Sequence, residues 1–399
     1  MVQHLGKPTM PDAELAREVR NRVEKRFVEL LDYLRTLVRA ESPTSDPAAV
    51  ERVLKTLAGS LEELGFQARR IPGKTSAGLL LAYPRGPRRG HPAQLLLGHA
   101  DTVWPVGTLE TMPLREEEGC LWGPGVFDMK GGLAQMIWAL RILKELGLEP
   151  PVTPVVLVTS DEELRGDDSR RWIRLLARRV VRTWVLEPAG PNGAVKTARK
   201  AIGDYRIVVR GRAAHAGVEP EKGINAVTEL AHILLALDAL NDWERGVSVN
   251  AGVIRGGTRP NVVPAEAEAL LDVRAWRQAD FDEVDRKIRE LRPRRAGAEI
   301  LVEGGLERPA MERTPGNRAL WELARRTGLL LGLKLQETAT GGGSDGNFTS
   351  LFTPTLDGLG PCGGGAHAMT EHIEIASLLD RTALLCLLLL APPEVGEEA

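Results

Sequence analysis

One short apolar run constrains this chain more than any other stretch, because it ends abruptly in a histidine. Residues Leu95–Gly98 are apolar or glycine, and His99 and Asp101 follow them. Such a run is typical of a buried strand in a parallel sheet, where ligands gather at the carboxyl ends of the strands. Side chains alternate along a strand, so His99 and Asp101 should share a face. The pair fits either a metal-bound imidazole oriented by a carboxylate or a hydrogen-bonded pair without metal.

Strand-like and helix-like patterns alternate along the first half of the chain. Helical periodicity with dense charge over 12–40 predicts one long surface helix. Further helices are expected at 47–64, 131–146 and 170–179, and strands within 66–83, at 154–159 and at 183–186. An exposed loop is expected between Pro84 and Pro92. This alternation predicts an α/β domain with a mainly parallel sheet.

The pattern changes near residue 200. Strands are expected at 204–210, 247–254, 266–274 and 299–303, and helices at 223–241 and 280–291. The order strand, helix, strand, strand, helix, strand is typical of an α+β split-βαβ (ferredoxin-like) sandwich. We therefore predict an inserted domain at 199–311 and a discontinuous catalytic domain at 1–198 and 312–399, where helices return at 317–332 and 374–390.

Charge and composition argue against several function classes. The formal net charge is −2, so the chain lacks the basic surplus with which a nucleic-acid-binding protein neutralises phosphates. The longest apolar run, 383–391, is too short to span a bilayer, and residues 1–11 lack the apolar core of a signal peptide. The three cysteines are isolated, which argues against a disulfide framework. We therefore expect a soluble, cytoplasmic protein whose partners include neither membrane nor nucleic acid.

Acidic and histidine residues recur where strands are expected to end. They are His99 with Asp101, Asp128, Glu162 with Glu163, Glu187, and His367. Carboxylates at buried strand ends are costly unless a positive charge neutralises them. Four converging acidic groups and two histidines exceed the needs of one divalent ion. Two ions bridged by one carboxylate would satisfy the charge count, and mixed nitrogen and oxygen ligands suit zinc.

Several short motifs together resemble one known family. They are GHADTV at 98–103, GPGVFDMKGG at 123–132, TSDEE at 159–163, LEP at 186–188, GRAAHAG at 211–217, TGGGSD at 340–345 and GAH at 365–367. In this order and across nearly the whole chain, they resemble the co-catalytic zinc peptidases and amidohydrolases that include aminoacylase, acetylornithine deacetylase and succinyl-diaminopimelate desuccinylase. The closest likeness is to bacterial glutamate carboxypeptidase. Each motif is weak by itself, whereas the set is specific.

The resemblance implies a metal-binding role for five of these residues. Asp128 would bridge two zinc ions per subunit, with Co²⁺ or Mn²⁺ as possible substitutes. His99 and Glu187 would complete one site, and Glu163 and His367 the other.

Two further residues would support the chemistry. By the same resemblance, Asp101 would orient His99, and Glu162 would be the general base. The two ions would deprotonate a bridging water, Glu162 would take its proton, and the hydroxide would attack an amide carbonyl before Glu162 returns the proton to the leaving nitrogen. The family also implies a cis peptide bond between Asp128 and Met129.

His215 belongs to the predicted inserted domain. On sequence alone it fits a surface or turn histidine. The resemblance instead implies that it reaches into the active site of a partner subunit and stabilises the tetrahedral oxyanion. This in turn implies a homodimer formed through the inserted domain, which would also close on the substrate as a lid.

Four more residues match family positions that contact the substrate. They are Asn261, Arg274, Arg308 and Gly343. Arginine is suited to clamp a carboxylate with two hydrogen bonds, although a solvated strand-end charge or a structural ion pair is an alternative for each arginine. The lysine that contacts the glutamate side chain in the glutamate-cleaving branch has no clear counterpart, although Lys196 and Lys200 lie nearby in sequence.

The resemblance therefore predicts a metallo-carboxypeptidase that cleaves the amide bond to a C-terminal amino acid. An N-acyl-amino-acid deacylase is the alternative within the same class. A metal-free binding protein with the same fold is the alternative from another class, and all five expected ligands and Glu162 argue against it.

Overall fold

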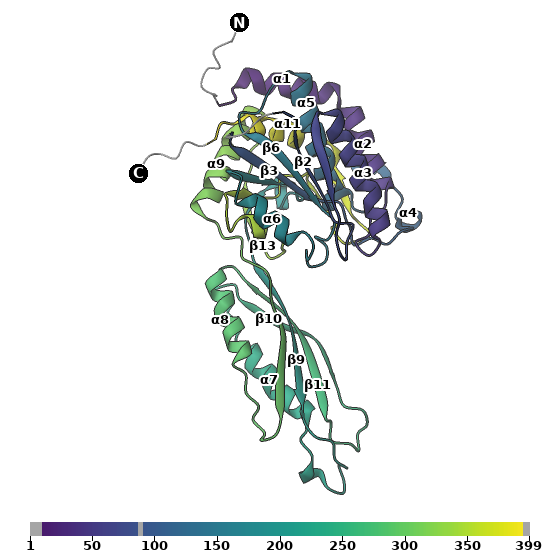
Figure 1. The fold of residues 1–399 in the computed structure, drawn as a ribbon, viewed down its shortest axis with the longest axis vertical. Helices are drawn as coiled ribbons and strands as arrows, with labels where there is room; N and C mark the ends of the chain where they lie inside the picture. Colours follow the sequence, from purple (N-terminus) through teal and green to yellow (C-terminus); the bar gives the residue numbers. More distant parts are fainter. Residues whose placement is uncertain (1–9, 87–90, 394–399) are drawn as a thin grey trace. The chain divides into compact units, whose positions relative to one another are not determined.

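The computed structural model describes residues 10–86 and 91–393, and these divide into two compact units (Figure 1). Unit 1 contains the described residues up to Thr197, then Arg313–Ala339 and those from Ser344 onward, and unit 2 contains Ala198–Glu312 and Thr340–Gly343. The loop expected between Pro84 and Pro92 falls partly outside the described residues, and so do residues 1–9 of the segment tested for a signal peptide.

Unit 1 is built on a six-stranded sheet. The strands, in spatial order, are β1 (Phe66–Ile71), β2 (Leu79–Pro84), β6 (Thr153–Thr159), β3 (Ala93–His99), β7 (Arg182–Val185) and β14 (Thr355–Leu356). Strand β3 runs parallel to both β6 and β7, and β14 is parallel to β7. Strands β1 and β2 form an antiparallel edge. The expectation of an α/β fold with a mainly parallel sheet is confirmed.

Helices cover both faces of this sheet (Figure 1). Leu96, Val156 and Trp184 on one face belong to a large core shared with the helices α1 (Ala13–Lys25), α2 (Phe27–Arg39), α3 (Pro47–Glu63), α5 (Gly131–Glu145), α9 (Pro315–Leu330) and α11 (Ile375–Leu390). On the other face, Leu95 and Leu97 pack in a smaller core with the helices α6 (Arg170–Ala177) and α10 (Gly346–Thr349). Strand β3 is therefore buried on both sides, which explains its unbroken apolar sequence.

The single helix expected over 12–40 is wrong, because two helices meet at Arg26. Arg26 has φ −111° and ψ 11°, and helix α1 ends there as helix α2 begins. Each half buries its own apolar face, with Val19 and Val23 in α1 and Leu30 and Leu34 in α2. A break between the halves lets both pack onto the core, whereas sequence periodicity continues through it.

A second, small sheet brings two distant segments of unit 1 together. Its strands, in order, are β15 (Gly363–Gly364), β16 (His372–Glu374), β5 (Cys120–Trp122) and β4 (Arg115–Glu117). The pairing of β16 with β5 is antiparallel. The segment around His367, between β15 and β16, is thereby fixed beside the segment around Asp128, which follows β5.

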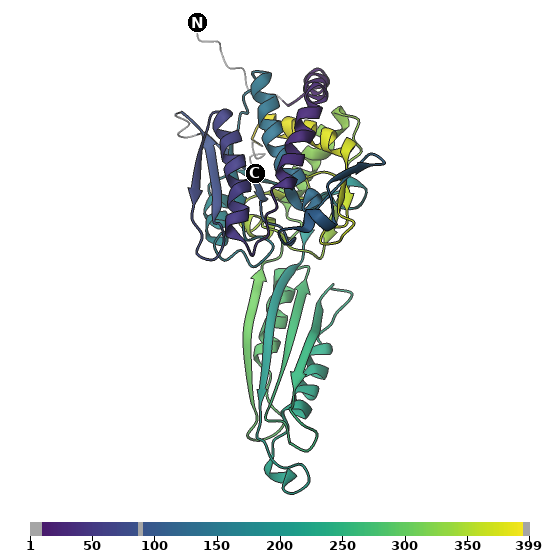
Figure 2. The same cartoon turned by 90° about the vertical axis from the view of Figure 1, so that its right-hand side faces the viewer.

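Unit 2 has the strand and helix order expected of a split-βαβ domain. Its elements are β9 (Ala201–Arg210), α7 (Ala226–Asp238), β10 (Ser248–Gly256), β11 (Glu266–Ala275), α8 (Gln278–Arg289) and β12 (Glu299–Arg308). The sheet has the order β10-β11-β9-β12 and is antiparallel throughout. Both helices pack on one face of it, as Figure 2 shows.

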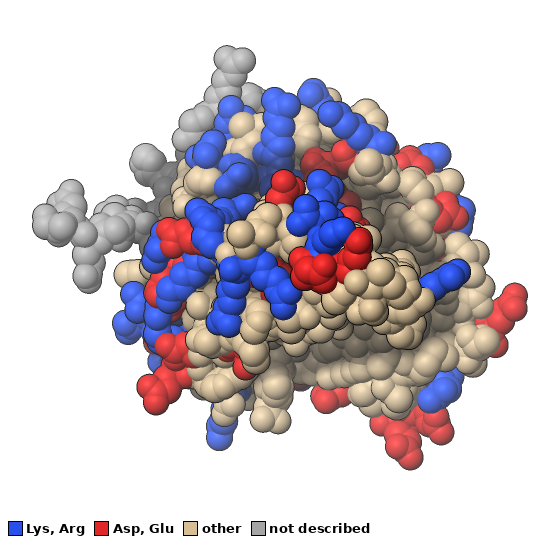
Figure 3. Space-filling model, turned by 90° about the horizontal axis from the view of Figure 1, so that it is seen from below, with Lys and Arg blue, Asp and Glu red and all other residues tan. Residues whose placement is uncertain are grey.

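The remaining short elements are α4 (Thr108–Thr111), the paired strands β8 (Val195–Arg199) and β13 (Glu337–Thr340), and the helical turns at Val126–Lys130, Pro191–Gly193 and Pro220–Lys222. On the face drawn in Figure 3, basic and acidic side chains both occur, many next to one another, as the small net charge suggests. Among the described residues, no helix combines the length and the apolar composition that crossing a bilayer requires.

Candidate metal centre

The expected metal ligands of unit 1 come from five separate segments. Three follow neighbouring parallel strands: His99 ends β3, Glu163 follows β6 and Glu187 follows β7. Asp128 lies between β5 and α5, and His367 lies between β15 and β16. Because parallel strands end at the same edge of a sheet, the first three side chains meet there. The small sheet adds the other two.

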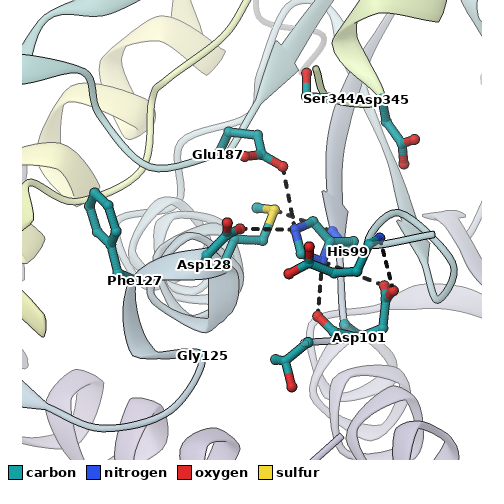
Figure 4. Close-up of polar contacts among 12 residues, drawn as sticks. His99, Asp101, Gly125, Phe127, Asp128, Glu187, Ser344 and Asp345 are labelled. Atoms are coloured by element: carbon teal, nitrogen blue, oxygen red, sulfur yellow. Dashed lines mark hydrogen bonds and ion pairs between the residues drawn. The ribbon is translucent and has the colours of Figure 1, made fainter. Parts of the chain in front are cut away.

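His99 has two carboxylates beside one ring nitrogen. Its Nε2 lies 3.1 Å from Oδ1 of Asp128 and 3.4 Å from Oε1 of Glu187. In Figure 4, the side chains of Asp128 and Glu187 point toward this imidazole. His99 itself is only 1% exposed, so water contributes little to the solvation of this group.

His367 has an equivalent pair of carboxylates. Its Nε2 lies 3.1 Å from Oε2 of Glu163 and 3.5 Å from Oδ2 of Asp128. The two oxygens of Asp128 therefore face different histidines, and each histidine has a second carboxylate of its own. His367 also has φ 60°, a left-handed backbone conformation that is uncommon for residues other than glycine.

Asp101 holds the other nitrogen of His99. The Nδ1 atom lies 3.0 Å from the backbone oxygen of Asp101 and 3.5 Å from its Oδ1. Asp101 is fully buried, and its Oδ2 accepts hydrogen bonds from the Thr44 hydroxyl and from the backbone N–H of Glu163. The residue thus connects the histidine of one ligand group to the glutamate of the other.

Glu162 also lies at this centre. One carboxylate oxygen of Glu162, one of Glu187 and a ring nitrogen of His99 all lie within 4.8 Å of one another. The neighbouring Asp161 is buried instead, and its Oδ2 accepts hydrogen bonds from the backbone N–H groups of Asp168 and Ser169. Two consecutive glutamates therefore face the cluster, while the aspartate before them fixes the loop.

The electrostatics show that this cluster is organised around positive charge. Burial lowers the pKa of His99, but contacts with Asp101, Asp128 and Glu187 outweigh burial and raise the pKa well above its usual range. Hydrogen bonds to Asp128 and Glu163 raise the pKa of His367 to about 10. Burial and the nearby Asp128 charge raise the pKa of Glu163. Burial opposes ionisation of Asp128, yet the two histidines hold its pKa below the usual range. Each half of the cluster thus requires a cation or a proton.

The residues present fit divalent metal ions. Oε1 of Glu163 is buried without a hydrogen-bond partner, although buried polar atoms are normally satisfied. Imidazole nitrogens with carboxylate oxygens form the donor set of zinc and similar ions. His99, Asp128 and Glu187 could hold one ion, and Asp128, Glu163 and His367 a second.

The backbone around the cluster shows two further features. The peptide bond between Asp128 and Met129 is cis, as the resemblance implied. Gly132, in the first turn of α5, lies directly against the end of β7, because a Cβ atom there would come within 2.0 Å of the backbone oxygen of Leu186. Only glycine allows this close approach, which sets the position of Glu187 relative to Asp128.

Sequence reasoning missed two buried charged residues beside the cluster. Glu371 is fully buried and accepts hydrogen bonds from the backbone of the loop that carries Asp128. Lys130 is 1% exposed, and its ammonium group donates to the backbone oxygen of Ala40 at 2.9 Å. Burial lowers the pKa of Lys130 to about 7, partly offset by the charge of Glu371. Neither residue follows an apolar run, and the backbone groups that they bind lie far away in the sequence.

The residues expected to contact substrate lie in unit 2 and form two separate groups. Arg274 and Arg308 both pair with Ile202 at the first end of β9, and Gly343 lies against Arg308. His215 and Asn261 lie beyond the other end of β9.

The group near Ile202 is partly buried. Arg308 is only 3% exposed, so the alternative of a solvated strand-end charge does not apply to it. Arg274 is paired with Asp272 at 2.9 Å and donates to the backbone oxygen of Gly341. Arg199, which sequence reasoning did not select, donates to the backbone oxygens of Gly342 and Gly343.

The group beyond the other end of β9 is exposed. His215 and Asn261 both face solvent, and the backbone N–H of Ala216 donates to the oxygen of Asn261 at 3.0 Å.

Comparison with known proteins gives a consistent result. Residues 95–391 match the model of peptidase family M20/M25/M40. The chain is 30% identical over 363 residues to carboxypeptidase G2 of Pseudomonas sp. (strain RS-16), covering 88% of this chain and 86% of that protein. It is 29% identical over 370 residues to succinyl-diaminopimelate desuccinylase of Bordetella parapertussis, covering 88% and 94%.

Among solved structures, the aminopeptidase PepT of Bacillus cereus has a similar fold. It superposes with a TM-score of 0.73 at 23% identity, covering 93% of this chain and 98% of that one. At this level of identity the likeness concerns the fold alone.

Proposed function

The chain belongs to peptidase family M20/M25/M40 and is a hydrolase of amide bonds, and we propose that it uses two divalent metal ions to release a C-terminal amino acid. Zinc is the ion we expect, since the donor set is mixed nitrogen and oxygen. The observation that carries the proposal is the position of Asp128, whose two carboxylate oxygens lie 3.1 Å from His99 and 3.5 Å from His367.

The arrangement of the side chains supports a mechanism in which Glu162 transfers the proton and Asp101 orients His99. Two bound cations would polarise the scissile carbonyl and lower the pKa of a water molecule. Glu162, beside His99 and Glu187, takes one proton from that water, while the oxygen of the water forms a bond to the carbonyl carbon. Glu162 then gives the proton to the nitrogen as the C–N bond breaks. Asp101 keeps Nδ1 of His99 protonated, so that Nε2 faces Asp128 and Glu187.

Unit 2 supplies the groups for substrate recognition in this proposal. The carboxylate of the C-terminal residue would bind near Arg274, Arg308 and Gly343, where guanidinium groups gather around the glycine-rich segment Thr340–Gly343. The likeness to carboxypeptidase G2 favours a carboxypeptidase. The likeness to succinyl-diaminopimelate desuccinylase favours the alternative, an N-acyl-amino-acid deacylase.

The length of unit 2 supports a dimer. Ile202 and Arg210 lie eight residues apart on β9, which corresponds to roughly 27 Å. Arg274 pairs with Ile202 at one end of that distance, and His215 lies beyond the other end, so one amino-acid-sized substrate cannot contact both residues of the same chain. We therefore propose that His215 and Asn261 act in the active site of a second subunit, where His215 stabilises the oxyanion.

The surface of unit 2 offers an interface for that dimer. Leu235 on α7 is 70% exposed, and Ile254 on β10 is 56% exposed. Strand β10 is an edge of its sheet and can pair with another strand. We propose that unit 2 serves as the dimerisation domain and as a lid.

We also propose that the protein is located in the cytoplasm.

A substrate panel tests the proposed function. The purified enzyme would be assayed on N-acyl-glutamate, N-acetyl-ornithine, succinyl-diaminopimelate and neutral N-acyl amino acids, with and without a chelator. The highest kcat/KM should be found for N-acyl-glutamate and should be lost on chelation. A preference for succinyl-diaminopimelate or N-acetyl-ornithine would favour the deacylase alternative. Full activity after chelation would contradict metal dependence.

A further inference from the structure

Glu371 is a buried carboxylate, and three of its four side-chain hydrogen bonds come from the loop that carries Asp128. It is 0% exposed. Its Oε1 accepts from the backbone N–H groups of Phe127 and Asp128, both at 2.9 Å. Its Oε2 accepts from the backbone N–H of Gly125 at 2.9 Å and from the indole N–H of Trp104 at 2.6 Å. Four donors converging on one carboxylate make a strong, directional contact.

These contacts determine the path of the loop that carries Asp128. The loop contains Gly123 and Gly125, and Gly125 has φ 70°, so the local sequence does little to restrict the backbone. Buried backbone N–H groups need partners. For Gly125, Phe127 and Asp128 that partner is the side chain of Glu371.

Glu371 also connects this loop to His367. It lies four residues after His367, and its N–H donates to the backbone oxygen of Ala368 at 2.9 Å. Its own backbone oxygen accepts from the N–H of Gly123 at 3.2 Å. Glu371 therefore links the segment of His367 to the segment of Asp128, two of the ligands proposed to share one ion.

We propose that Glu371 is a positioning residue, which fixes the carboxylate of Asp128 between the two histidines through the backbone of the Gly125–Asp128 loop. This inference rests on the proposed function, because it assumes that Asp128 binds metal. Glu371 does not touch the proposed metal positions and acts through Asp128. In the Glu371→Gln variant, the amide NH₂ would face N–H donors, so the loop would lose one or two of its contacts.

The test measures metal affinity rather than activity alone. Zn²⁺ would be titrated into metal-free wild type and Glu371→Gln in competition with a chromophoric chelator, with thermal unfolding of both metal-free proteins recorded. We expect Glu371→Gln to bind Zn²⁺ about 10- to 100-fold more weakly, as is typical when a residue supporting a metal ligand is lost. Excess Zn²⁺ should restore much of the activity.

The chain provides a matched control in Glu41. Its carboxylate accepts backbone hydrogen bonds from Gly107 at 2.8 Å and from Leu109 at 2.9 Å, at the start of α4, which holds none of the expected ligands. Glu41→Gln should leave Zn²⁺ affinity unchanged. If Glu371→Gln does not fold, Trp104→Phe removes one of the four donors and should weaken Zn²⁺ binding by a few-fold.

The outcomes separate this inference from the proposed function. Wild-type protein that binds fewer than two ions would contradict the proposed function. Wild-type protein that binds two ions, with Zn²⁺ affinity equal in Glu371→Gln or Trp104→Phe, would overturn only the role of Glu371. An equal loss of affinity in Glu41→Gln would overturn it as well.

Discussion

The expected functional residues are arranged differently in the two units: they converge in unit 1 and lie apart in unit 2. In unit 1, five ligands from five segments converge, and His99–Asp128 and His367–Glu163 approach to 3.1 Å. In unit 2, His215 and Asn261 are exposed beyond one end of a sheet whose other end holds Arg274 and Arg308. Like charges brought together in a buried site require a neutralising cation or proton there, so the cluster in unit 1 has the donor groups that a metal site needs. His215 and Asn261 are exposed and lie a strand's length from Arg274 and Arg308. They can therefore contribute to a binding site only where a surface of another subunit covers them.

The largest expected effect on this contrast comes from removing the proposed general base of unit 1. Glu162→Gln should lower kcat by about 10²- to 10⁴-fold, because proton transfer to the leaving nitrogen is lost. The variant should keep both metal ions, as measured by mass spectrometry of the metal content. Glu163→Gln is the matched comparison, and it should lose metal as well as activity. Loss of metal in Glu162→Gln, or nearly normal turnover, would contradict the assigned roles.

The second prediction concerns the exposed histidine of unit 2. His215→Ala should lower kcat by about 10²- to 10³-fold, the usual effect of losing an oxyanion donor, and should keep two metal ions. Steady-state kinetics and metal analysis check both parts. Full turnover in this variant would refute the role of His215.

Mixed dimers show whether His215 acts on its own chain. Each parent variant, His215→Ala or Glu162→Gln, should be nearly inactive. After subunit exchange between them, half of the dimers are mixed and each has one competent site, so activity should recover to about a quarter of wild type. No recovery, with exchange verified by mass spectrometry, would show that the two residues act within one chain.

The third prediction compares glycines of the two units. Gly132→Ala should destabilise the protein by about 1–3 kcal/mol, because the added methyl group meets the backbone oxygen of Leu186 and no rotamer change can relieve it. Gly341 in unit 2 has no atom within 4 Å of the same position, so Gly341→Ala should be nearly neutral. Urea unfolding measures both. Equal stabilities would mean that the packing of α5 against β7 tolerates displacement.

The prediction with the smallest expected effect concerns the pKa values of two acidic residues, one in each unit. Asp168 in unit 1 has its pKa lowered to about 2; burial opposes this shift, but the backbone N–H groups of Lys74, Thr75 and Ser76 outweigh burial. Glu283 in unit 2 has its pKa lowered to about 2 by Lys287 and Arg245. A carboxyl group whose pKa is lowered by folding stabilises the folded state when the pH is above its pKa in the unfolded chain, which is near 4. This stabilisation is lost as the pH falls toward 2.

Salt should separate the two residues. Mobile ions screen the exposed pairs of Glu283 but not the short hydrogen bonds of Asp168. NMR titration should therefore find that the pKa of Glu283 rises toward 4 in about 1 M salt, while the pKa of Asp168 stays low. A salt-insensitive Glu283 would show that its pairs are stronger than surface ion pairs.

The sequence was informative wherever an expected site residue followed an apolar strand. His99, Glu163 and Glu187 were found in this way, because a buried strand must be apolar and its end is where polar chemistry begins. Asp128 was among the acidic residues at expected strand ends, but its bridging role, like the substrate contacts expected in unit 2, came only from the resemblance. Glu371 was missed because its role comes from backbone groups distant in sequence. The break at Arg26 was missed because amphipathic periodicity does not record where a helix must turn to pack.

The central claim is that Asp128 joins two metal ions, and a metal titration tests it most directly. Metal-free protein would be titrated with Zn²⁺, and bound metal per chain would be measured for wild type, Asp128→Ala and His215→Ala. We predict two tightly bound ions for wild type and for His215→Ala, and loss of tight binding at both positions in Asp128→Ala. Saturation of wild type at one ion, or two tightly bound ions in Asp128→Ala, would contradict the account.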